Sequence, residues 1–443
     1  MSRLEDLGAR FTAPSTIGLV AIGGYIALLR GAGDASWQAM IVVVALIFGR
    51  TALSLRYKPS TRTSSPVRRA ALVVPFYNED DDGLRRTFGS IVTQTRLPDA
   101  LFVVNDGSPI GGDEVTRWLP VLRKLIPHVE YIVFAENRGK RSALVAAINA
   151  TDCDIIITTD SDTTLRRDAI AEILRPFASR NVSAVTGRIG VKNRFRNPLT
   201  LLQEVIYGVA FLHGRAALSQ MGSVLVCSGA LAAYRRRTIT PYLEDFMRNP
   251  WMFGEDRHLT NYALRHGRVV LQTSAIALTD VPESLRHYLR QQIRWQRGFL
   301  QQSVWVLRHF PLRNRVFWMT FSRSAIWLFL TAMVPLLVLG GGAEILVHGL
   351  VAHLLVSWAH LARYVGSSEG SFGLRLGLLV VGPLLAFGQT ILLTPVRLYA
   401  LFTSGAKGWG SRIRPGAAAK SDVNHRRVVG EVTSAVRAEA VNH

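Results

Sequence analysis

Cysteine is scarce in this chain of 443 residues, which contains only Cys153 and Cys227. Two cysteines cannot build a disulfide framework, so a disulfide-rich secreted scaffold is excluded and a reducing cytosolic environment is favoured. Acidic residues are also few, because 31 Asp and Glu stand against 52 Lys and Arg, a formal net charge of +21. Since 49% of the residues are hydrophobic, this composition favours a membrane protein with a basic cytoplasmic portion.

Signatures of metal-binding histidine clusters and of nucleic-acid binding are also missing. The histidines lack metal-ligand spacing and are interpreted as structural or interfacial: His213, His258, His266, His287 and His309. No basic-aromatic platform accompanies the positive charge, and anionic lipid explains basic residues beside membrane spans equally well. We therefore expect no nucleic-acid partner.

Two apolar runs, Ile17 to Leu29 and Trp37 to Leu55, lie close together near the N-terminus. The first run alone could be the hydrophobic region of a signal peptide. Because the second follows after a short polar link and ends in basic residues, residues 1–58 are predicted to form a transmembrane hairpin with both ends in the cytoplasm.

Further apolar runs follow residue 315 and predict a C-terminal transmembrane region over residues 317–404: Ala325 to Leu339, Ile345 to Leu361, and Phe372 to Phe402. A membrane span needs about 20 residues, so the last run is too long for one untilted helix and too short for two. Because it contains Pro383 and Pro395, we interpret it as kinked or re-entrant. The basic tail, residues 405–443, is predicted to be cytoplasmic, and mostly disordered from Ala417 onward.

Between residues 59 and 280, short β-branched runs alternate with stretches of helix length such as Asp82 to Gln94 and Lys140 to Ala150. The predicted strands cover residues 70–76, 100–106, 130–135, 153–160 and 181–187. This alternation predicts an α/β domain with a largely parallel, doubly wound sheet, which resembles a Rossmann fold. Ligands of such sheets bind beyond the carboxyl ends of the strands.

Acidic residues follow three of these predicted strands: Glu79 after the first, Asp106 after the second, and Asp160-Ser161-Asp162 after the fourth. Asp160 and Asp162 can hold a divalent cation, since Mg²⁺ is usually bound by one or two carboxylates together with substrate phosphates. The alternative is a solvated turn with no ligand.

The segment 137–141, Asn-Arg-Gly-Lys-Arg, opens a predicted helix. Glycine permits close backbone approach and a helix N-terminus favours anions, so Lys140 and Arg141 are candidates for a phosphate site. An ordinary basic first turn is the alternative, although the helix dipole disfavours it.

These motifs, together with Gly254-Glu255-Asp256 and Gln291-x-x-Arg294-Trp295, occur in order from residue 73 to residue 412. The chain resembles the inverting, processive, membrane-embedded family 2 glycosyltransferases, a group that includes cellulose, chitin and hyaluronan synthases. The likeness to hyaluronan synthases and rhizobial chitin-oligosaccharide synthases rests on residues 222–229, 254–264, 279–282 and 395–412. The resemblance implies a GT-A-like cytoplasmic domain over residues 59–280 and interface helices over residues 281–316.

The resemblance also implies which residues bind the donor. Contacts with the UDP-sugar are expected from Pro75, Tyr77, Asn78, Glu79, Asp106, Lys140, Arg141 and Asp160, and from a gating loop with Trp409 and Arg412. Asp160 and Asp162 correspond to the ligands of Mg²⁺ or Mn²⁺ on the donor pyrophosphate.

The resemblance assigns the transfer step to a second group of residues. Asp256 corresponds to the general base, Arg294 would stabilise the departing diphosphate, and Trp295 would lie under the acceptor sugar. Gln291 belongs to the same motif, and an acceptor-site segment comprises Cys227, Ser228 and Gly229. An N-terminal helix cap is the alternative role for Asp256.

Gln291, Arg294 and Trp295 are spaced i, i+3 and i+4, so one helical face can present all three. The neighbouring Arg286, Arg290 and Arg297 are interpreted as the membrane-facing part of an amphipathic interface helix.

The resemblance implies a multi-pass plasma-membrane enzyme that polymerises UDP-activated sugars, with hyaluronan as the expected product and the growing polysaccharide and membrane lipid as partners. A monomer would suffice. Single-sugar polymers, a non-processive lipid-linked sugar transferase and a non-catalytic channel subunit are the alternatives. Several positions depart from hyaluronan synthases, among them Gly214, Leu218 and Gln296, and these departures put sugar and acceptor selection in doubt.

Overall fold

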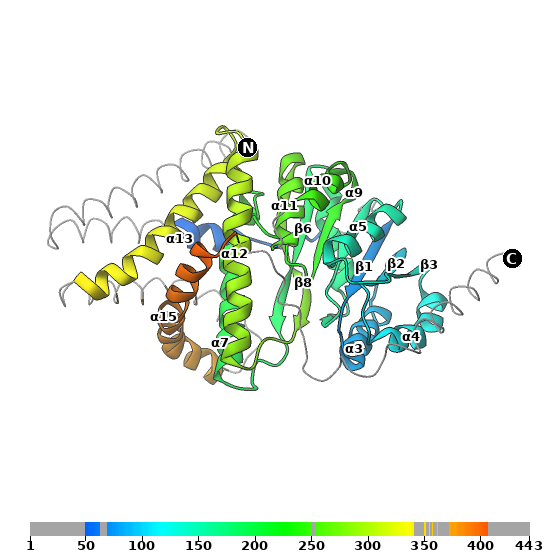
Figure 1. The fold of residues 1–443 in the computed structure, drawn as a ribbon, viewed down its shortest axis with the longest axis horizontal. Coiled ribbons are helices and arrows are strands. Elements are labelled where there is room, and N and C mark those ends of the chain that lie inside the picture. The colour runs from blue at the N-terminus through cyan, green and yellow to red at the C-terminus, as the bar shows by residue number, and fades with distance from the viewer. Residues whose placement is uncertain are drawn as a thin grey trace, which may run out of the picture.

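The computed structural model describes residues 49–62, 69–249, 253–340 and 372–405, together with Leu350, Leu354, Ser357 and Leu361. Most of the predicted N-terminal hairpin, the run from Ile345 to Leu361 apart from these four single positions, and the tail beyond residue 405 lie outside these residues. Figure 1 shows a sheet flanked by helices, with long helices beside it.

The sheet has eight strands in the order β3-β2-β1-β4-β7-β6-β8-β5. Their bounds are β1 (Ala70–Phe76), β2 (Ala100–Asn105), β3 (His128–Val133), β4 (Ile155–Thr158), β5 (Thr163–Leu165), β6 (Val182–Val191), β7 (Ala232–Arg235) and β8 (Arg268–Thr279). Parallel pairing joins β1 to β2 and β4, β2 to β3, and β6 to β8. The pairs β4–β7, β6–β7 and β5–β8 are antiparallel, so the sheet is mixed.

The central strands are mostly apolar, as expected of strands that are buried on both faces. Every residue of β1 and of β2 is buried. Shorter helices connect or cover the strands: α3 (Asp81–Val92), α4 (Gly112–Leu125), α5 (Lys140–Ala150), α6 (Ala169–Leu174), α9 (Arg236–Ile239), α10 (Leu243–Arg248) and α11 (Glu255–His266), with single turns at Arg175–Ala178 and Thr240–Tyr242. The expected α/β domain is therefore present.

The chain after β6 forms α7 (Pro198–Val209), a π-helical turn (Ala210–Arg215) and α8 (Ala216–Gln220). Asn197 caps α7, since its side chain accepts a hydrogen bond from the N–H of Thr200 and its own N–H donates to the Thr200 hydroxyl. β6 continues past Thr186, its last pairing with β7, and remains paired with β8 as far as Val191. This extension projects beyond the carboxyl end of β4 and is followed by α7.

Three long helices complete the described chain: α12 (Leu285–His309), α13 (Arg315–Gly340) and α15 (Phe372–Phe402). α12 packs against both α13 and α15, and Tyr288, Leu393 and Val396 form a buried cluster between α12 and α15. In the part of the chain that the structure describes, one segment, Val380–Phe402, is long and apolar enough to cross a membrane.

The structure differs from the sequence interpretation in α15. We predicted a kinked or re-entrant segment, but one α-helix of 31 residues runs through Pro383 and Pro395. The re-entrant alternative is therefore wrong. Each proline removes one backbone hydrogen bond, and apolar helices tolerate this loss where neighbouring helices pack around them.

Candidate active site

Asp106 lies directly after β2 and fixes the loop that opens α5. Its Oδ1 accepts hydrogen bonds from the backbone N–H groups of Arg138 and Gly139, at 2.8 and 3.1 Å. The side chain is buried, and this burial raises the pKa of the carboxyl, although the two N–H donors oppose the shift. The end of β2 and the start of α5 are thereby held together at the carboxyl edge of the sheet.

The segment after β1 is tied to the same edge. Asn78 has a positive φ of 51°, and its N–H donates to the Ser108 hydroxyl at 2.9 Å. Glu79 is buried and accepts a hydrogen bond from the Ser161 hydroxyl at 3.1 Å. Pro75 and Tyr77 precede these residues, at the end of β1 and just after it. The first strand end therefore contacts the Asp-x-Asp segment directly.

Lys140, the first residue of α5, forms an ion pair with Asp160 and lies 3.8 Å from Glu255 Oε1. Burial alone would lower the pKa of Lys140, but Asp160 and Glu255 together raise it. A Cβ atom added to Gly229 would lie 3.1 Å from the Lys140 ammonium and 3.7 Å from Asp160 Oδ1. The acceptor segment therefore reaches the Asp-x-Asp carboxylates at a glycine, where a larger side chain would crowd the Lys140 ammonium.

Asp256 is the second residue of α11, after Gly254 with a positive φ of 78°. Its Oδ1 accepts a hydrogen bond from the Arg257 N–H at 2.7 Å, and its carbonyl accepts one from the Thr260 hydroxyl. Burial and the neighbouring Glu255 carboxylate raise the pKa of Asp256 to about 6, while Lys140 opposes the shift. A carboxylate poised at this pKa suits proton abstraction near neutral pH.

The residues before Gly229 are anchored through their backbone. The N–H of Cys227 donates to the Thr260 hydroxyl at 3.0 Å, and the N–H of Ser228 donates to the Thr186 hydroxyl at 3.1 Å. The Cys227 side chain is fully buried, and this burial raises the pKa of its thiol to about 12. The thiol is therefore protonated at neutral pH and serves as packing.

Gln291, Arg294 and Trp295 all lie on α12. The Trp295 side chain is 45% exposed, and its ring lies 6.1 Å from the ring of Tyr207 on α7, at an interplanar angle of 38°. Gln291 Oε1 is buried and finds no hydrogen-bond partner in the described chain. An exposed aromatic ring beside a tyrosine is a suitable platform for a pyranose face.

Sequence reasoning missed several residues of this site. Glu255 was read only as part of a motif, yet it lies close to Lys140. Burial raises the pKa of the Tyr207 phenol, with Arg215 opposing and Asp162 adding to the shift, so α7 approaches the Asp-x-Asp segment. No local signal identifies Tyr207, because its position depends on how α7 packs.

Arg257 is a further missed residue, and it connects Asp256 to α12. Its Nη1 donates to the Phe299 carbonyl at 3.0 Å and its Nη2 to the Ser303 hydroxyl at 3.1 Å. Burial, with a smaller contribution from Arg323, lowers the pKa of Arg257 to about 9. This buried arginine fixes the start of α11 against the helix that carries Trp295.

Arg141, an expected donor contact, is engaged by backbone carbonyls of α10 and the loop after it. Arg141 donates to the carbonyls of Phe246 and Asn249, at 3.3 and 3.0 Å, and its guanidinium lies 5.2 Å from the Phe246 ring centroid. It therefore braces the loop after α10. Trp409 and Arg412 lie outside the described residues.

The expected ligands for a cation at this edge are the Asp160 and Asp162 carboxylates. No group of three His, Cys, Asp or Glu side chains placed to hold a metal occurs in the described part of the chain. Two hard oxygen donors fit Mg²⁺ or Mn²⁺ when substrate phosphates supply the other ligands.

Comparison with known proteins identifies the family. Residues 71–241 match the family model of glycosyl transferase family 2. A hyaluronan synthase from Streptococcus pyogenes is 32% identical over 414 residues, which cover 90% of this chain and 96% of that protein. An N-acetylglucosaminyltransferase from Azorhizobium caulinodans is 33% identical over 361 residues, covering 78% of this chain and 87% of that protein.

Among solved structures, one similar to this chain is a mannosyltransferase from Pyrobaculum calidifontis in complex with GDP-Man and Mn²⁺. The match covers 83% of this chain and 96% of the mannosyltransferase chain, with 20% sequence identity and a TM-score of 0.49. The sequence identities with the bacterial synthases, which extend over nearly the whole chain, decide the assignment. The chain belongs to glycosyl transferase family 2, in the group that includes the hyaluronan synthases.

Proposed function

We propose that this protein is a processive, inverting glycosyltransferase that polymerises UDP-activated sugars into an extracellular β-linked polysaccharide and translocates the product across the plasma membrane. The observation that carries the proposal is the convergence of Asp256, the Lys140–Asp160 pair and Gly229 at one edge of the sheet. We propose hyaluronan as the product, with UDP-GlcNAc and UDP-GlcA as donors.

In this proposal, Asp106 and the segment from Pro75 to Asn78 hold the uridine, while Glu79 fixes the Asp-x-Asp segment through Ser161. Asp160 and Asp162 would hold Mg²⁺ or Mn²⁺, which neutralises pyrophosphate charge when it is bound. Lys140, paired with Asp160 here, lies where it can pair with a phosphate instead.

Asp256 accepts the proton of the acceptor hydroxyl as that oxygen attacks the anomeric carbon in line with the departing UDP. The bond to the diphosphate breaks as the new glycosidic bond forms, which inverts the anomeric configuration. Arg294 stabilises the charge on the leaving diphosphate, and Trp295 with Tyr207 supports the acceptor ring. Trp409 and Arg412 are proposed to close over the bound nucleotide.

We further propose a multi-pass enzyme whose catalytic domain, residues 59–280, faces the cytoplasm and whose monomer suffices for activity. The proposed transmembrane parts are residues 1–58 and 317–404, with interface helices over residues 281–316 and a cytoplasmic gating loop and tail over residues 405–443. The apolar segment Val380–Phe402 supports the membrane assignment.

A single-sugar product is the second candidate function, and the relative from Azorhizobium caulinodans, an N-acetylglucosaminyltransferase, favours it. The deciding experiment supplies membrane vesicles with UDP-GlcNAc, UDP-GlcA and UDP-Glc, singly and in pairs, with Mg²⁺ or Mn²⁺. Polymer that requires both UDP-GlcNAc and UDP-GlcA and is cut by hyaluronidase supports hyaluronan synthesis. Polymer that forms from UDP-GlcNAc alone and is cut by chitinase would assign the single-sugar product instead of hyaluronan. Transfer of only one sugar to lipid would exclude processive synthesis.

A further inference from the structure

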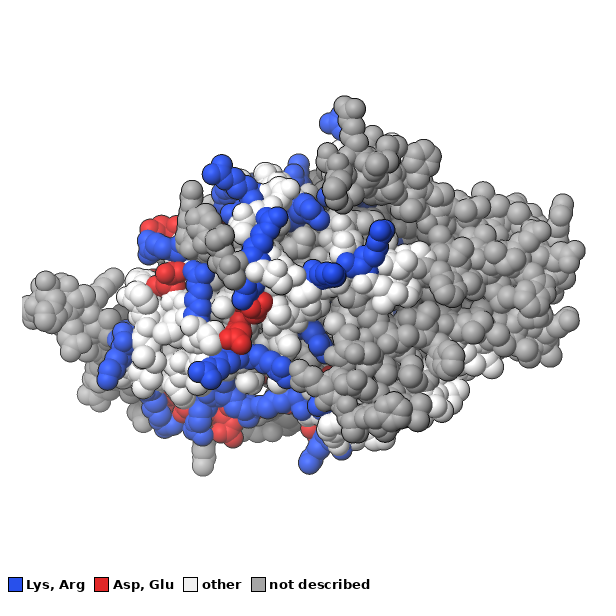
Figure 2. All heavy atoms as spheres, turned by 180° about the vertical axis from the view of Figure 1, so that it is seen from behind, with Lys and Arg blue, Asp and Glu red and all other residues white. Residues whose placement is uncertain are grey.

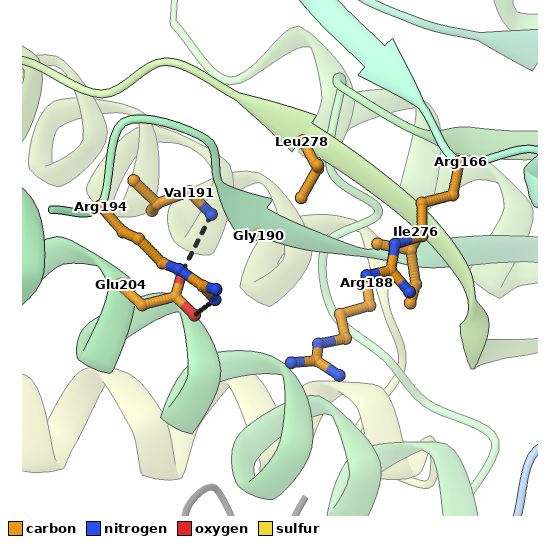
Figure 3. A pocket seen from close by; sticks show the side chains of 8 residues that line it. All are labelled: Arg166, Arg188, Gly190, Val191, Arg194, Glu204, Ile276 and Leu278. Carbon is orange, nitrogen blue, oxygen red and sulfur yellow. Dashed lines mark hydrogen bonds and ion pairs between the residues drawn. The ribbon is translucent and has the colours of Figure 1, made fainter. Parts of the chain in front are cut away.

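A small basic pocket lies between β6, β8 and α7, with a volume of about 50 Å³ (Figure 3). Its polar lining consists of Arg166, Arg188, Arg194 and Glu204, and Leu278 belongs to its apolar wall. Three arginines and one glutamate give this lining two more positive charges than negative ones. None of these residues has a role in the proposed transfer reaction.

The single carboxylate of the pocket is already engaged. Glu204 accepts a hydrogen bond from the Val191 N–H at 2.9 Å and lies 3.8 Å from Arg194 Nη1, as the dashed lines of Figure 3 mark. The Arg188 side chain is half-buried and makes no hydrogen bond or ion pair with any other residue that the structure describes. A half-buried guanidinium without a partner favours an anionic ligand, because partial desolvation of the cation is otherwise uncompensated.

Arg188 and Arg166 lie on backbone that the sheet holds in place. Arg188 follows an irregularity in which Gly187 pairs with Gln272 but Arg188 pairs with Ile276, and such bulges redirect side chains. The Arg166 N–H donates to the Ile276 carbonyl at 2.9 Å, and the Arg166 carbonyl accepts a hydrogen bond from Gln94. This part of the pocket is therefore preformed, and preorganisation lowers the entropic cost of binding.

Size and shape select the ligand group. A water-sized sphere needs about 10–15 Å³, so the pocket holds a group of a few atoms and excludes a sugar nucleotide. A tetrahedral phosphate has enough oxygens to accept hydrogen bonds from several guanidinium groups that approach from different sides. A planar carboxylate suits this arrangement less well, because one guanidinium can already satisfy it in a bidentate pair.

The surroundings connect the pocket to the helices that lie beside the sheet. Leu199 of α7 packs on the cluster formed by α12 and α15, and Val205 packs on Leu361. Phe195, in the loop before α7, is 65% exposed, and the Arg194 guanidinium lies 4.9 Å from its ring centroid. An exposed aromatic ring beside basic side chains is typical of a segment at the lipid headgroup level.

We propose that Arg166, Arg188 and Arg194 form a binding site for a phosphate group, carried by an anionic phospholipid or free in solution. Glu204 and Tyr207 are three residues apart and lie on one face of α7. A bound phosphate would therefore join β6 to the helix that places Tyr207 beside Trp295, and it would stabilise the acceptor platform.

The test uses the full-length protein, purified in neutral detergent and stripped of lipid, and compares it with Arg188→Gln, Arg188→Lys and Arg194→Gln. Binding of phosphatidylglycerol is measured by native mass spectrometry, and binding of orthophosphate by titration calorimetry. Arg180→Gln is the matched control, since Arg180 is exposed and lies before β6, outside the pocket. Circular dichroism establishes that each variant is folded.

We expect Arg188→Gln and Arg194→Gln each to weaken binding about tenfold, the loss typical of one charged hydrogen-bonding group. Arg188→Lys should retain part of the affinity, and Arg180→Gln should bind like the wild type. Binding of phosphatidylglycerol alone identifies a lipid headgroup as the source, whereas binding of orthophosphate identifies a free anion. If the wild type binds neither, or if both glutamine variants bind as it does, the site does not exist. Neither readout requires sugar transfer, so failure of the proposed reaction would leave this test intact.

Discussion

At the scale of single residues, Asp256 is the side chain on which the proposed chemistry depends most directly. Replacing it by asparagine keeps the shape but removes the proton acceptor. Asp256→Asn should lower UDP release in membrane vesicles by about 10²–10⁴-fold, the usual contribution of a general base, without reducing the amount of membrane-inserted protein. Asp152→Asn, at a carboxylate that is 76% exposed, is the matched control and should leave turnover unchanged. Near-normal turnover in Asp256→Asn would refute the base assignment.

The raised pKa of Asp256 has a second consequence. The acceptor proton is taken only by the ionised carboxylate, so activity should be full above pH 7 and fall about tenfold for each pH unit below about 6. Lys140 favours the ionised form, and therefore Lys140→Gln should move this acidic limb to higher pH. Initial rates at saturating donor, measured from pH 5 to 8, give the midpoint. A limb that stays in place in Lys140→Gln would contradict the electrostatic coupling of the two groups.

Residues that occur in local motifs could be identified from the sequence, whereas their contacts could not. Asp106 and Asp160 follow strands and were predicted as ligand contacts for that reason. Their partners, the Arg138 and Gly139 N–H groups and Lys140, depend on how the strand ends meet. Whether each assigned side chain acts in binding or catalysis stays a prediction until it is tested by substitution.

At the scale of elements, α12 separates residues of different roles on its faces. Arg290 is exposed and Arg294 is half-buried, four residues further along the helix. In the proposed mechanism, only Arg294 reaches the leaving diphosphate. Arg294→Ala should reduce kcat at least tenfold, while Arg290→Ala should change it less than twofold. Equal losses in the two variants would assign both arginines to the structure of the helix instead.

Arg297 differs from its sequence interpretation. We expected a membrane-facing side chain, but its Nε and Nη2 donate to the Thr403 hydroxyl at 3.2 and 2.8 Å, and its guanidinium lies 5.6 Å from the Tyr399 ring centroid. It therefore connects α12 to the end of α15. Arg297→Gln should destabilise this contact by about 1 kcal/mol, seen as a lower thermal midpoint in detergent. Arg286→Gln, at an exposed position, should leave the midpoint unchanged, and an equal decrease would refute the assignment.

The strands that sequence patterns predicted are rich in β-branched residues and, except for β3, largely buried. Each matches a strand from β1 to β4 or β6. β5 was missed because it has only three residues, and β7 because its sequence, Ala-Ala-Tyr-Arg, contains no β-branched residue. β8 was missed although it has 12 residues, since its buried and partly exposed positions do not alternate regularly. These strands make the antiparallel pairs, so the mixed half of the sheet could not be predicted.

At the scale of the whole molecule, much of the positive charge lies at the surface. Figure 2 shows blue Lys and Arg side chains spread over one face of the described part, with fewer red Asp and Glu side chains among them. A basic surface beside apolar helices is favoured on the cytoplasmic side, where anionic lipids and the positive-inside bias both act. Charge therefore supports the proposed orientation.

This orientation can be tested because both native cysteines are buried and free. A membrane-impermeant maleimide should label the wild type weakly from either side, which leaves a clean background for an introduced thiol. Arg180→Cys places one at an exposed position of the catalytic domain. We expect labelling in inside-out vesicles and none in intact cells, since the bilayer separates the reagent from a cytoplasmic domain. Labelling from outside intact cells would place the catalytic domain on the extracellular side of the membrane. Cytosolic UDP-sugar could not reach Asp106 or Asp160 there, so this result would also refute the proposed function.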